Sequence, residues 1–216
     1  MNRLFDINNP FFRFMSKFFD IMVLSIVFVI CCVPVLTIGP AITALYYSIA
    51  KAVRRDRSYP VKEFFHAFKR DFRQSAIVGI IILAISAIIV VDIRIVIGTG
   101  DAKLGSLKIA YVVVALLIAF ISTYIFPLIS RFSLKMKDLF KLAFFLSFKH
   151  FLSTILCVLI LAAGVVGVFV SMGLFLLFIP GLVALLISFP MEKVLKKTLE
   201  QIGTGTDHNA DQWYAE

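Results

Sequence analysis

The stretch Cys32-Val33-Pro34-Val35-Leu36-Thr37-Ile38-Gly39-Pro40 interrupts a run of thirty uncharged residues, 21–50. Pro34 has no amide hydrogen and clashes with the preceding helical turn, so a helix that reaches it must end or bend there. Gly39 tolerates backbone conformations that other residues avoid, and Pro40 suits the first turn of a new helix. The run therefore predicts two helical pieces joined sharply at membrane depth.

The composition excludes a water-soluble globular protein. Hydrophobic residues make up 61% of the chain and charged residues 16%, with a mean hydropathy of +0.98. Soluble domains carry roughly 45–50% apolar and about 25% charged residues. A fold of 216 residues cannot hide this much apolar surface from water, so lipid must be the solvent for much of it.

Charged residues are banded along the chain. Four stretches contain no Lys, Arg, Asp or Glu: 21–50, 74–91, 109–130 and 150–191. A membrane-spanning helix needs about 20 apolar residues, so the second and third stretches hold one span each, and the first and last are long enough for two. We expect an all-α, polytopic membrane helix bundle with six membrane segments, or five if the first stretch is a single kinked span.

Basic residues indicate which loops face the cytoplasm. Segment 51–73 carries eight basic and three acidic residues, and segment 131–149 carries five basic residues and one acidic residue. By the positive-inside rule both segments are cytoplasmic, as is the C-terminus. The expected location is the cytoplasmic membrane of a bacterium, crossed several times. Residues 1–202 are expected to form one membrane domain, followed by a polar, disordered tail, 203–216.

Three geometries of the joint between Pro34 and Pro40 fit this charge pattern. A hairpin places the N-terminus in the cytoplasm, and we favour it. A single kinked span places the N-terminus outside. A re-entrant break points the free amides near Pro40 into the bilayer, where they would favour an anion.

Short amphipathic helices are expected beside the spans, on the cytoplasmic membrane surface. In the one that follows Pro60, Phe64 and Phe68 fall on one stripe opposite Lys69. Two others are expected at residues 8–20 and 138–149; the former is alternatively the extended start of the first span.

The pattern Phe-Phe-x-x-Phe-Lys occurs twice, at residues 64–69 and 144–149. Each copy precedes an outward and a returning span, as expected of two parallel repeats. Because 23 residues of the chain are Phe, a chance match competes with this interpretation.

Sequence signatures of catalysis are absent. The chain contains no G-x-x-x-x-G-K-[ST], H-E-x-x-H, G-x-S-x-G or C-x-x-C pattern, and its three histidines lie in separate segments. We therefore expect no enzymatic activity, no cofactor and no metal site. The net charge of +9 is explained by the cytoplasmic loops, so no nucleic-acid partner is expected.

Segments 9–15 and 33–47 resemble the YesL-like family of bacterial membrane proteins, and the similarity continues through 64–69 and 72–74. The family is defined by a domain of unknown function. Its members are often encoded beside genes for carbohydrate uptake and breakdown. The resemblance implies an accessory part in sugar transport, and it brings no catalytic residues to transfer.

Two functions follow from these observations. The first is a non-enzymatic accessory or component of solute transport, with carbohydrate as the candidate solute. The second is a structural or regulatory membrane protein that binds protein partners or lipid through cationic, Phe-rich helices. The expected partners are the bilayer, a transporter complex or a second copy. The candidate functional residues are Pro34, Thr37, Gly39, Pro40, Tyr46, Tyr47, Phe64, Phe68 and Lys69.

Overall fold

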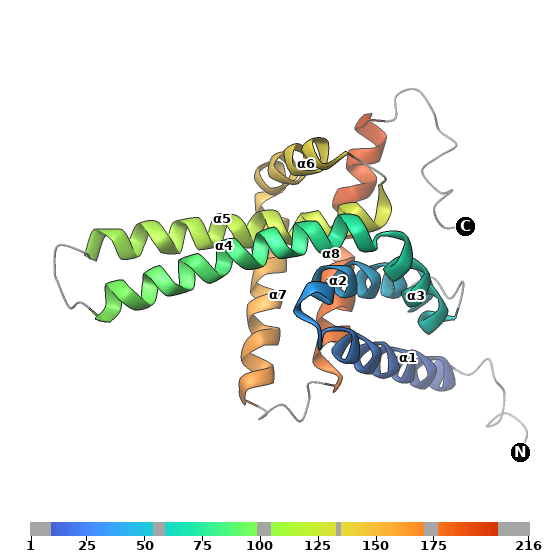
Figure 1. Ribbon diagram of the computed structural model, residues 1–216. Coiled ribbons are helices and arrows are strands. Elements are labelled where there is room, and N and C mark those ends of the chain that lie inside the picture. The colour runs from blue at the N-terminus through green and yellow to red at the C-terminus, as the bar shows by residue number, and fades with distance from the viewer. Residues whose placement is uncertain (1–9, 54–58, 99–104, 133–134, 171–176, 203–216) are drawn as a thin grey trace, which may run out of the picture.

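The fold is all-α, as predicted. A computed structural model describes residues 10–53, 59–98, 105–132, 135–170 and 177–202, and these residues contain no strand (Figure 1). The predicted tail, 203–216, lies outside them. The α-helices are α1 (Pro10–Cys31), α2 (Ile38–Ser48), α3 (Pro60–Arg70), α4 (Phe72–Gly98), α5 (Gly105–Arg131), α6 (Met136–Lys149), α7 (Phe151–Val170) and α8 (Ile179–Ile202).

Among the residues that the structure describes, four helical segments are long and apolar enough to cross a membrane. They are Val35–Val53, Phe72–Ile95, Ala110–Arg131 and Phe151–Val170. The chain is thus a membrane protein with several apolar helices, whereas the count of six segments is not confirmed. One cause is α8, whose final turns carry Glu192, Lys193 and Lys196.

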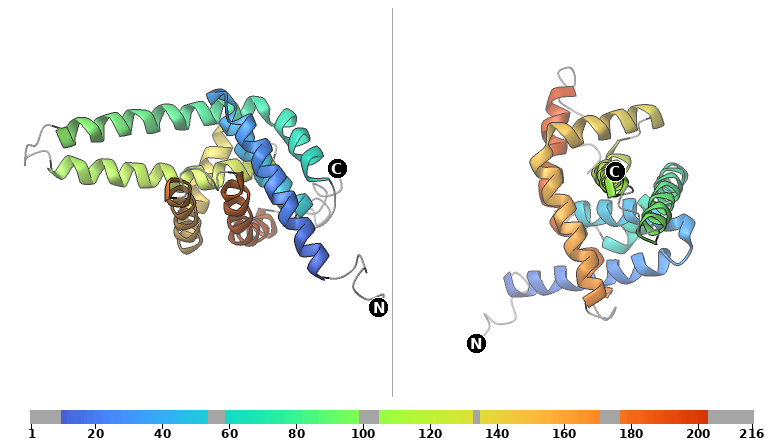
Figure 2. Two further views of the ribbon diagram at one scale, coloured as in Figure 1. Left: turned by 90° about the horizontal axis from the view of Figure 1, so that it is seen from below. Right: turned by 90° about the vertical axis from the view of Figure 1, so that its left-hand side faces the viewer.

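The predicted joint separates two helices. Helix α1 ends at Cys31, a 3₁₀ turn (η1, Val35–Thr37) follows, and α2 begins at Ile38. The Thr37 hydroxyl donates to the carbonyl of Pro34 at 2.6 Å and also to that of Cys31, the last residue of α1, whose carbonyl has no partner within the helix. The chain reverses here, so that α2 runs back beside α1 (Figure 2). This reversal is the local geometry that a hairpin requires.

Helix α1 is longer than the favoured interpretation allowed. Its residues from Pro10 to Cys31 form one continuous helix, so the described part of the predicted segment, 10–20, is the start of that helix and is not a separate surface helix. No residue between Pro10 and Pro34 lacks an amide or otherwise breaks a helix, which explains the continuity.

Two helical arms diverge from a common base. Helices α4 and α5 form one arm and α7 and α8 form the other, and the two arms cross steeply (Figures 1 and 2). Helix α2 contacts α4, α5 and α8 where the arms meet. The short helices α3 and α6 pack against α2 and α5 respectively, close to this base.

The two Phe-Phe-x-x-Phe-Lys segments lie in corresponding elements. A single residue separates each short helix from the long apolar helix that follows it: Asp71 lies between α3 and α4, and His150 lies between α6 and α7. Their buried faces differ, because Phe64 is fully buried whereas Phe144 is 52% exposed. The order of elements thus repeats, and internal duplication stays a prediction.

Candidate functional site

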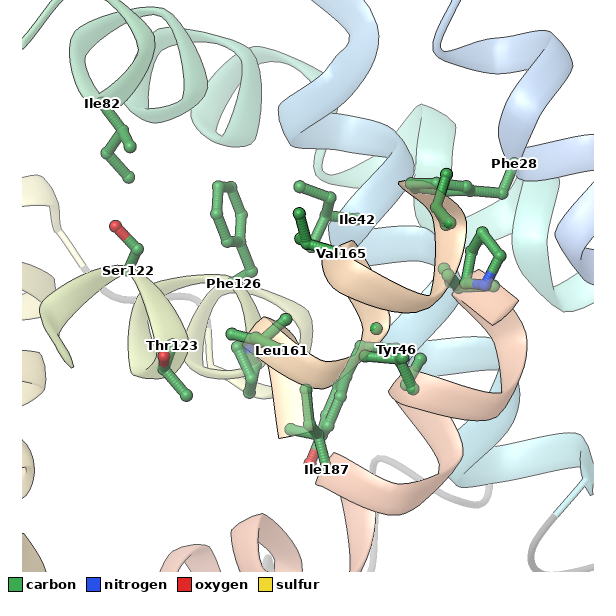
Figure 3. A pocket seen from close by; sticks show the side chains of 17 residues that line it. Phe28, Ile42, Tyr46, Ile82, Ser122, Thr123, Phe126, Leu161, Val165 and Ile187 are labelled. Atoms are coloured by element: carbon green, nitrogen blue, oxygen red, sulfur yellow. The ribbon is translucent and has the colours of Figure 1, made fainter. Parts of the chain in front are cut away.

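An apolar cavity of about 480 Å³ lies where the two arms diverge (Figure 3). Six helices contribute to its wall, so its shape depends on the whole fold. The lining residues are Phe28, Ile42, Leu45, Tyr46, Ile82, Ser122, Thr123, Phe126, Pro127, Leu161, Gly164, Val165, Val168, Pro180, Val183, Ala184 and Ile187.

The hydroxyl groups on the α5 side of the cavity are bound to their own helix. Ser122 donates to the carbonyl of Ile118 at 2.7 Å, and Thr123 donates to that of Ala119 at 2.8 Å. These bonds satisfy both hydroxyl protons, so neither side chain turns the wall into a polar surface. Most of the remaining lining is aliphatic or aromatic carbon.

Tyr46 connects the cavity to buried charges. Its ring lines the cavity and extends toward Ile187 (Figure 3), and its hydroxyl donates to Oε1 of Glu192 at 3.4 Å. Nη1 of Arg131 lies 3.4 Å from the same oxygen. The Arg131 and Glu192 side chains are only 2% and 6% exposed, so an ion pair is buried between α5 and α8.

The neighbouring Tyr47 belongs to a second buried ion pair. Its hydroxyl accepts a hydrogen bond from Nζ of Lys51 at 3.2 Å, and the same ammonium group lies 3.2 Å from Oε2 of Glu63. Lys51 lies in a π-helical turn, Ile49–Val53, that continues α2. Such turns are rare and occur frequently at functional sites. This pair fastens α3 to the end of α2.

Arg70 links both regions at the junction of α3 and α4. Its guanidinium lies 4.8 Å from the centre of the Tyr47 ring and donates to the carbonyl of Ser130 at 2.9 Å. It also donates twice to the Asp71 carboxylate, at 3.0 and 2.8 Å. Because these bonds favour the charged form, the pKa of Arg70 lies above its ordinary value.

We refer to these two neighbouring groups of side chains together as the polar layer. It joins α2, α3, α5 and α8 and adjoins the cavity through Tyr46. Its members are Tyr46, Tyr47, Lys51, Glu63, Arg70, Arg131 and Glu192.

The predicted residues of the joint have structural roles. Pro34 is exposed in the turn, and Thr37 bonds the carbonyls described above. Gly39 and Pro40 are buried in the first turn of α2, where it crosses α4. These residues set the path of α2 and do not line the cavity.

The remaining predicted residues divide between the polar layer and α3. Tyr46 and Tyr47 both belong to the polar layer. Phe64 is fully buried and its ring stacks on that of Phe68, with 6.0 Å between their centres. Lys69 is exposed on the outer face of α3, where we assign it no role.

Sequence reasoning missed the charged members of the polar layer. Lys51, Glu63 and Arg131 were assigned to cytoplasmic segments, because Lys51 and Arg131 directly follow apolar stretches and Glu63 lies within the basic segment 51–73. One signal was available: Lys51 and Arg131 are eighty residues apart, the same offset that relates Phe64 to Phe144. No comparable signal marks Glu192.

Comparison with known proteins gives two matches. The family described as "Protein of unknown function, DUF624" matches residues 21–93. The chain is also similar to "Uncharacterized protein YesL" of Bacillus subtilis (strain 168), with 29% identity over 161 residues, or 74% of each chain. No solved structure matches. The DUF624 segment covers α2, α3, the second half of α1 and most of α4, and thus includes Tyr46, Tyr47, Lys51, Glu63 and Arg70.

Proposed function

We propose that this chain, whose two matches support a YesL-like family of unknown function, is a non-enzymatic membrane protein that binds a lipid chain in the cavity. The observation that carries the proposal is the apolar wall of the cavity, to which two candidate spans, α5 and α7, contribute. Its volume of about 480 Å³ falls within the range of about 300–1,000 Å³ that is typical of ligand sites.

The surroundings of the cavity favour lipid as the occupant. Val165 lines the cavity and is 56% exposed, so the wall of α7 is continuous with a surface that faces the bilayer. At that depth the available molecules are acyl chains and other membrane-soluble compounds. The atoms of an unfilled wall lack dispersion partners on the cavity side. An acyl chain in the cavity would supply those contacts.

A carbohydrate is a poorer fit to this cavity. Sugar hydroxyls need hydrogen-bond partners, and each buried hydroxyl without one costs free energy. The hydroxyls of Ser122 and Thr123 are already bonded to their own helix. We therefore do not assign a sugar site to the cavity.

An accessory part in solute transport is the second candidate. The discontinuous segment α1–η1–α2 favours it, because broken helices at membrane depth commonly form the ion and solute sites of transporters. The test is uptake of labelled oligosaccharides by cells that lack the gene. Uptake at the normal rate would count against this role and would leave lipid binding unaffected.

A surface role of α6 is a further candidate. Phe144, Phe145 and Phe148 are 52%, 58% and 52% exposed, and Nζ of Lys149 lies 5.4 Å from the centre of the Phe145 ring. A cationic helix with exposed rings suits an anionic membrane surface or a protein partner. Crosslinking from Phe145 in membranes would distinguish them, and recovery of lipid alone would exclude the protein partner.

The cavity proposal is tested by fluorescence quenching with brominated phospholipids. The single tryptophan is replaced in Trp213→Phe, and a reporter is introduced at the cavity by Phe126→Trp. In nanodiscs, brominated chains should quench this reporter strongly although Phe126 is only 8% exposed. The controls are Val166→Trp, which is lipid-facing and must be quenched, and Phe64→Trp, which is buried away from the cavity and must not be.

Quenching of the Phe126→Trp reporter at the level of the Phe64→Trp control would overturn the proposal. A blocking variant gives an independent readout. Ala184→Phe introduces a ring into the cavity and should reduce the quenching of the reporter, whereas Val166→Phe should leave it unchanged.

A further inference from the structure

We propose that the turn between α1 and α2 lies inside the bilayer, in contact with lipid chains. The two helices then form a re-entrant hairpin, which enters and leaves the membrane on the same side. This inference does not depend on the cavity or on its ligand. It is carried by the apolar lengths of the two helices, by the position of the turn along α4 and by the side chains that the turn exposes.

The apolar part of each helix is too short to cross a bilayer. In α1 it begins after Asp20 and ends at Cys31, which is eleven residues, or about 16 Å of helix. From Ile38 to the residue before Lys51 there are thirteen residues, or about 20 Å. The hydrocarbon core is about 30 Å thick. A chain that enters along α1 therefore turns back before it reaches the opposite surface.

Helix α4 shows how far the turn reaches. Gly39, the second residue of α2, packs against Gly79 of α4. Gly79 lies seven residues after Phe72, or about 10 Å from the start of α4, and the next charged residue, Asp92, lies about 20 Å further on. Both arms also extend further from the base than the turn does (Figures 1 and 2). The turn thus lies between the two ends of α4 and not at its far end.

The surface of the turn is apolar. Turns in water are rich in Gly, Pro, Asn, Asp and Ser, and no charged residue occurs between residues 21 and 50. The polar side chain Thr37 bonds carbonyls of its own turn. Protein interfaces carry a polar rim, whereas lipid chains need none. Lipid chains therefore suit the side chains that are more than 60% exposed here: Ile30, Val33, Val35 and Leu36.

Hydrogen bonds within the turn suit a site without water, since lipid offers backbone groups no partners. The Cys32 amide donates to the carbonyl of Phe28 at 2.9 Å, and Pro34 has no amide. The Thr37 amide donates to the carbonyl of Pro34 at 3.0 Å, and its hydroxyl serves the carbonyls of Pro34 and Cys31. These carbonyls are bonded without water.

The surroundings of α2 differ from those of the other candidate spans. The most apolar part of Val35–Val53 is 72% buried within the protein, against 17% for Phe72–Ile95 and 11% for Phe151–Val170. Re-entrant segments occur where protein encloses them. Helix α2 thus has the enclosed position of a re-entrant leg, although its composition alone would allow it to cross.

Thiol labelling locates the turn in cells. The three native cysteines are replaced by alanine, and single thiols are introduced by Val35→Cys at the turn, Gly100→Cys between α4 and α5, and Lys69→Cys on the exposed face of α3. A membrane-impermeant maleimide should label Gly100→Cys in intact cells and Lys69→Cys only in opened cells. Val35→Cys should react at least about tenfold more slowly than both, because the reactive thiolate is scarce in hydrocarbon.

Fluorescence quenching identifies what surrounds the turn. In the Trp213→Phe protein in nanodiscs, Val35→Trp should be quenched by brominated phospholipid and protected from iodide in the buffer, whereas Lys69→Trp should be quenched by iodide. Labelling of Val35→Cys in intact cells as fast as Gly100→Cys, or iodide quenching of Val35→Trp, would place the turn in water and overturn the proposal. Protection from both quenchers would mean that protein, such as a second copy, covers the turn, and would overturn it as well.

Discussion

Gly39 of α2 and Gly79 of α4 bring two helix backbones into direct contact. A Cβ atom on Gly79 would lie 3.0 Å from the Cα atom of Gly39, and a Cβ atom on Gly39 would collide with the carbonyl oxygen of Ser75. Small residues allow membrane helices to approach closely, because association in lipid depends on packing and hydrogen bonds. The crossing fixes where α2 enters the base of the fold.

Gly39→Ala should destabilise the protein, because its new methyl group meets backbone that cannot move away. We expect a loss of about 1–3 kcal/mol, typical of overpacking. Thermal unfolding in a single detergent, followed by size-exclusion chromatography, measures it. Gly167→Ala is the control, because its Cβ atom would make an ordinary 3.4 Å contact with Ile179. Equal melting temperatures for the two variants would contradict the close crossing.

Ser25→Ala should loosen the contact between α1 and α8. The Ser25 hydroxyl donates to the carbonyl of Ile21 at 2.9 Å and accepts from the amide of Gly181 at 2.9 Å. Losing it leaves a buried amide without its acceptor, at a cost of about 1–3 kcal/mol. Ser122→Ala is the matched control, because that hydroxyl bonds its own helix. A larger effect of the control would refute the interhelical role.

Lys51→Met should be strongly destabilising. The Glu63 carboxylate would remain buried without its lysine, and breaking a buried pair costs about 3–5 kcal/mol. The double variant Lys51→Met, Glu63→Leu should recover much of that loss, since no charge then remains. Lys69→Met removes an exposed cation from α3 and should change little. If the double variant is no more stable than the single one, charge burial is not the cause.

Tyr124 and Thr154 should show measurable coupling across α5 and α7. Their hydroxyl oxygens are 3.1 Å apart in a buried position. A double-mutant cycle of Tyr124→Phe and Thr154→Val should give about 0.6 kcal/mol, and at most about 1.7 kcal/mol, as for other hydrogen bonds between membrane helices. Additive effects on the unfolding free energy would show that the pair contributes no net coupling.

The sequence predicted those features that depend on local composition. Apolar bands located α4, α5 and α7, and Pro34 with Gly39 located the break before α2, because helix breakers act within one turn. The length of α1 was misjudged, because the amphipathic segment 8–20 was expected to form a separate surface helix, although no residue between Pro10 and Pro34 ends a helix.

The cavity and the polar layer were beyond sequence reasoning, because both arise from contacts between distant segments. Tyr46 was selected as a candidate, but its partner Glu192 is 146 residues away. Charges at the ends of apolar stretches usually extend to the membrane surface, and that tendency concealed the burial of Lys51 and Arg131. Only the packing of α2 between α3, α5 and α8 turns these cations inward.

The steep crossing of the two arms has a consequence for the membrane around the protein. Spanning helices usually tilt by about 20°, and by at most about 40°, from the bilayer normal. The arm α4–α5 crosses the arm α7–α8 steeply, so the two arms cannot both lie close to the bilayer normal. At least one of them must be strongly inclined. The 20 residues of α7 span about 30 Å when upright and less when inclined. The bilayer beside the inclined arm must become thinner to match its shorter hydrophobic span. The membrane around the protein is therefore thinner on one side than on the other.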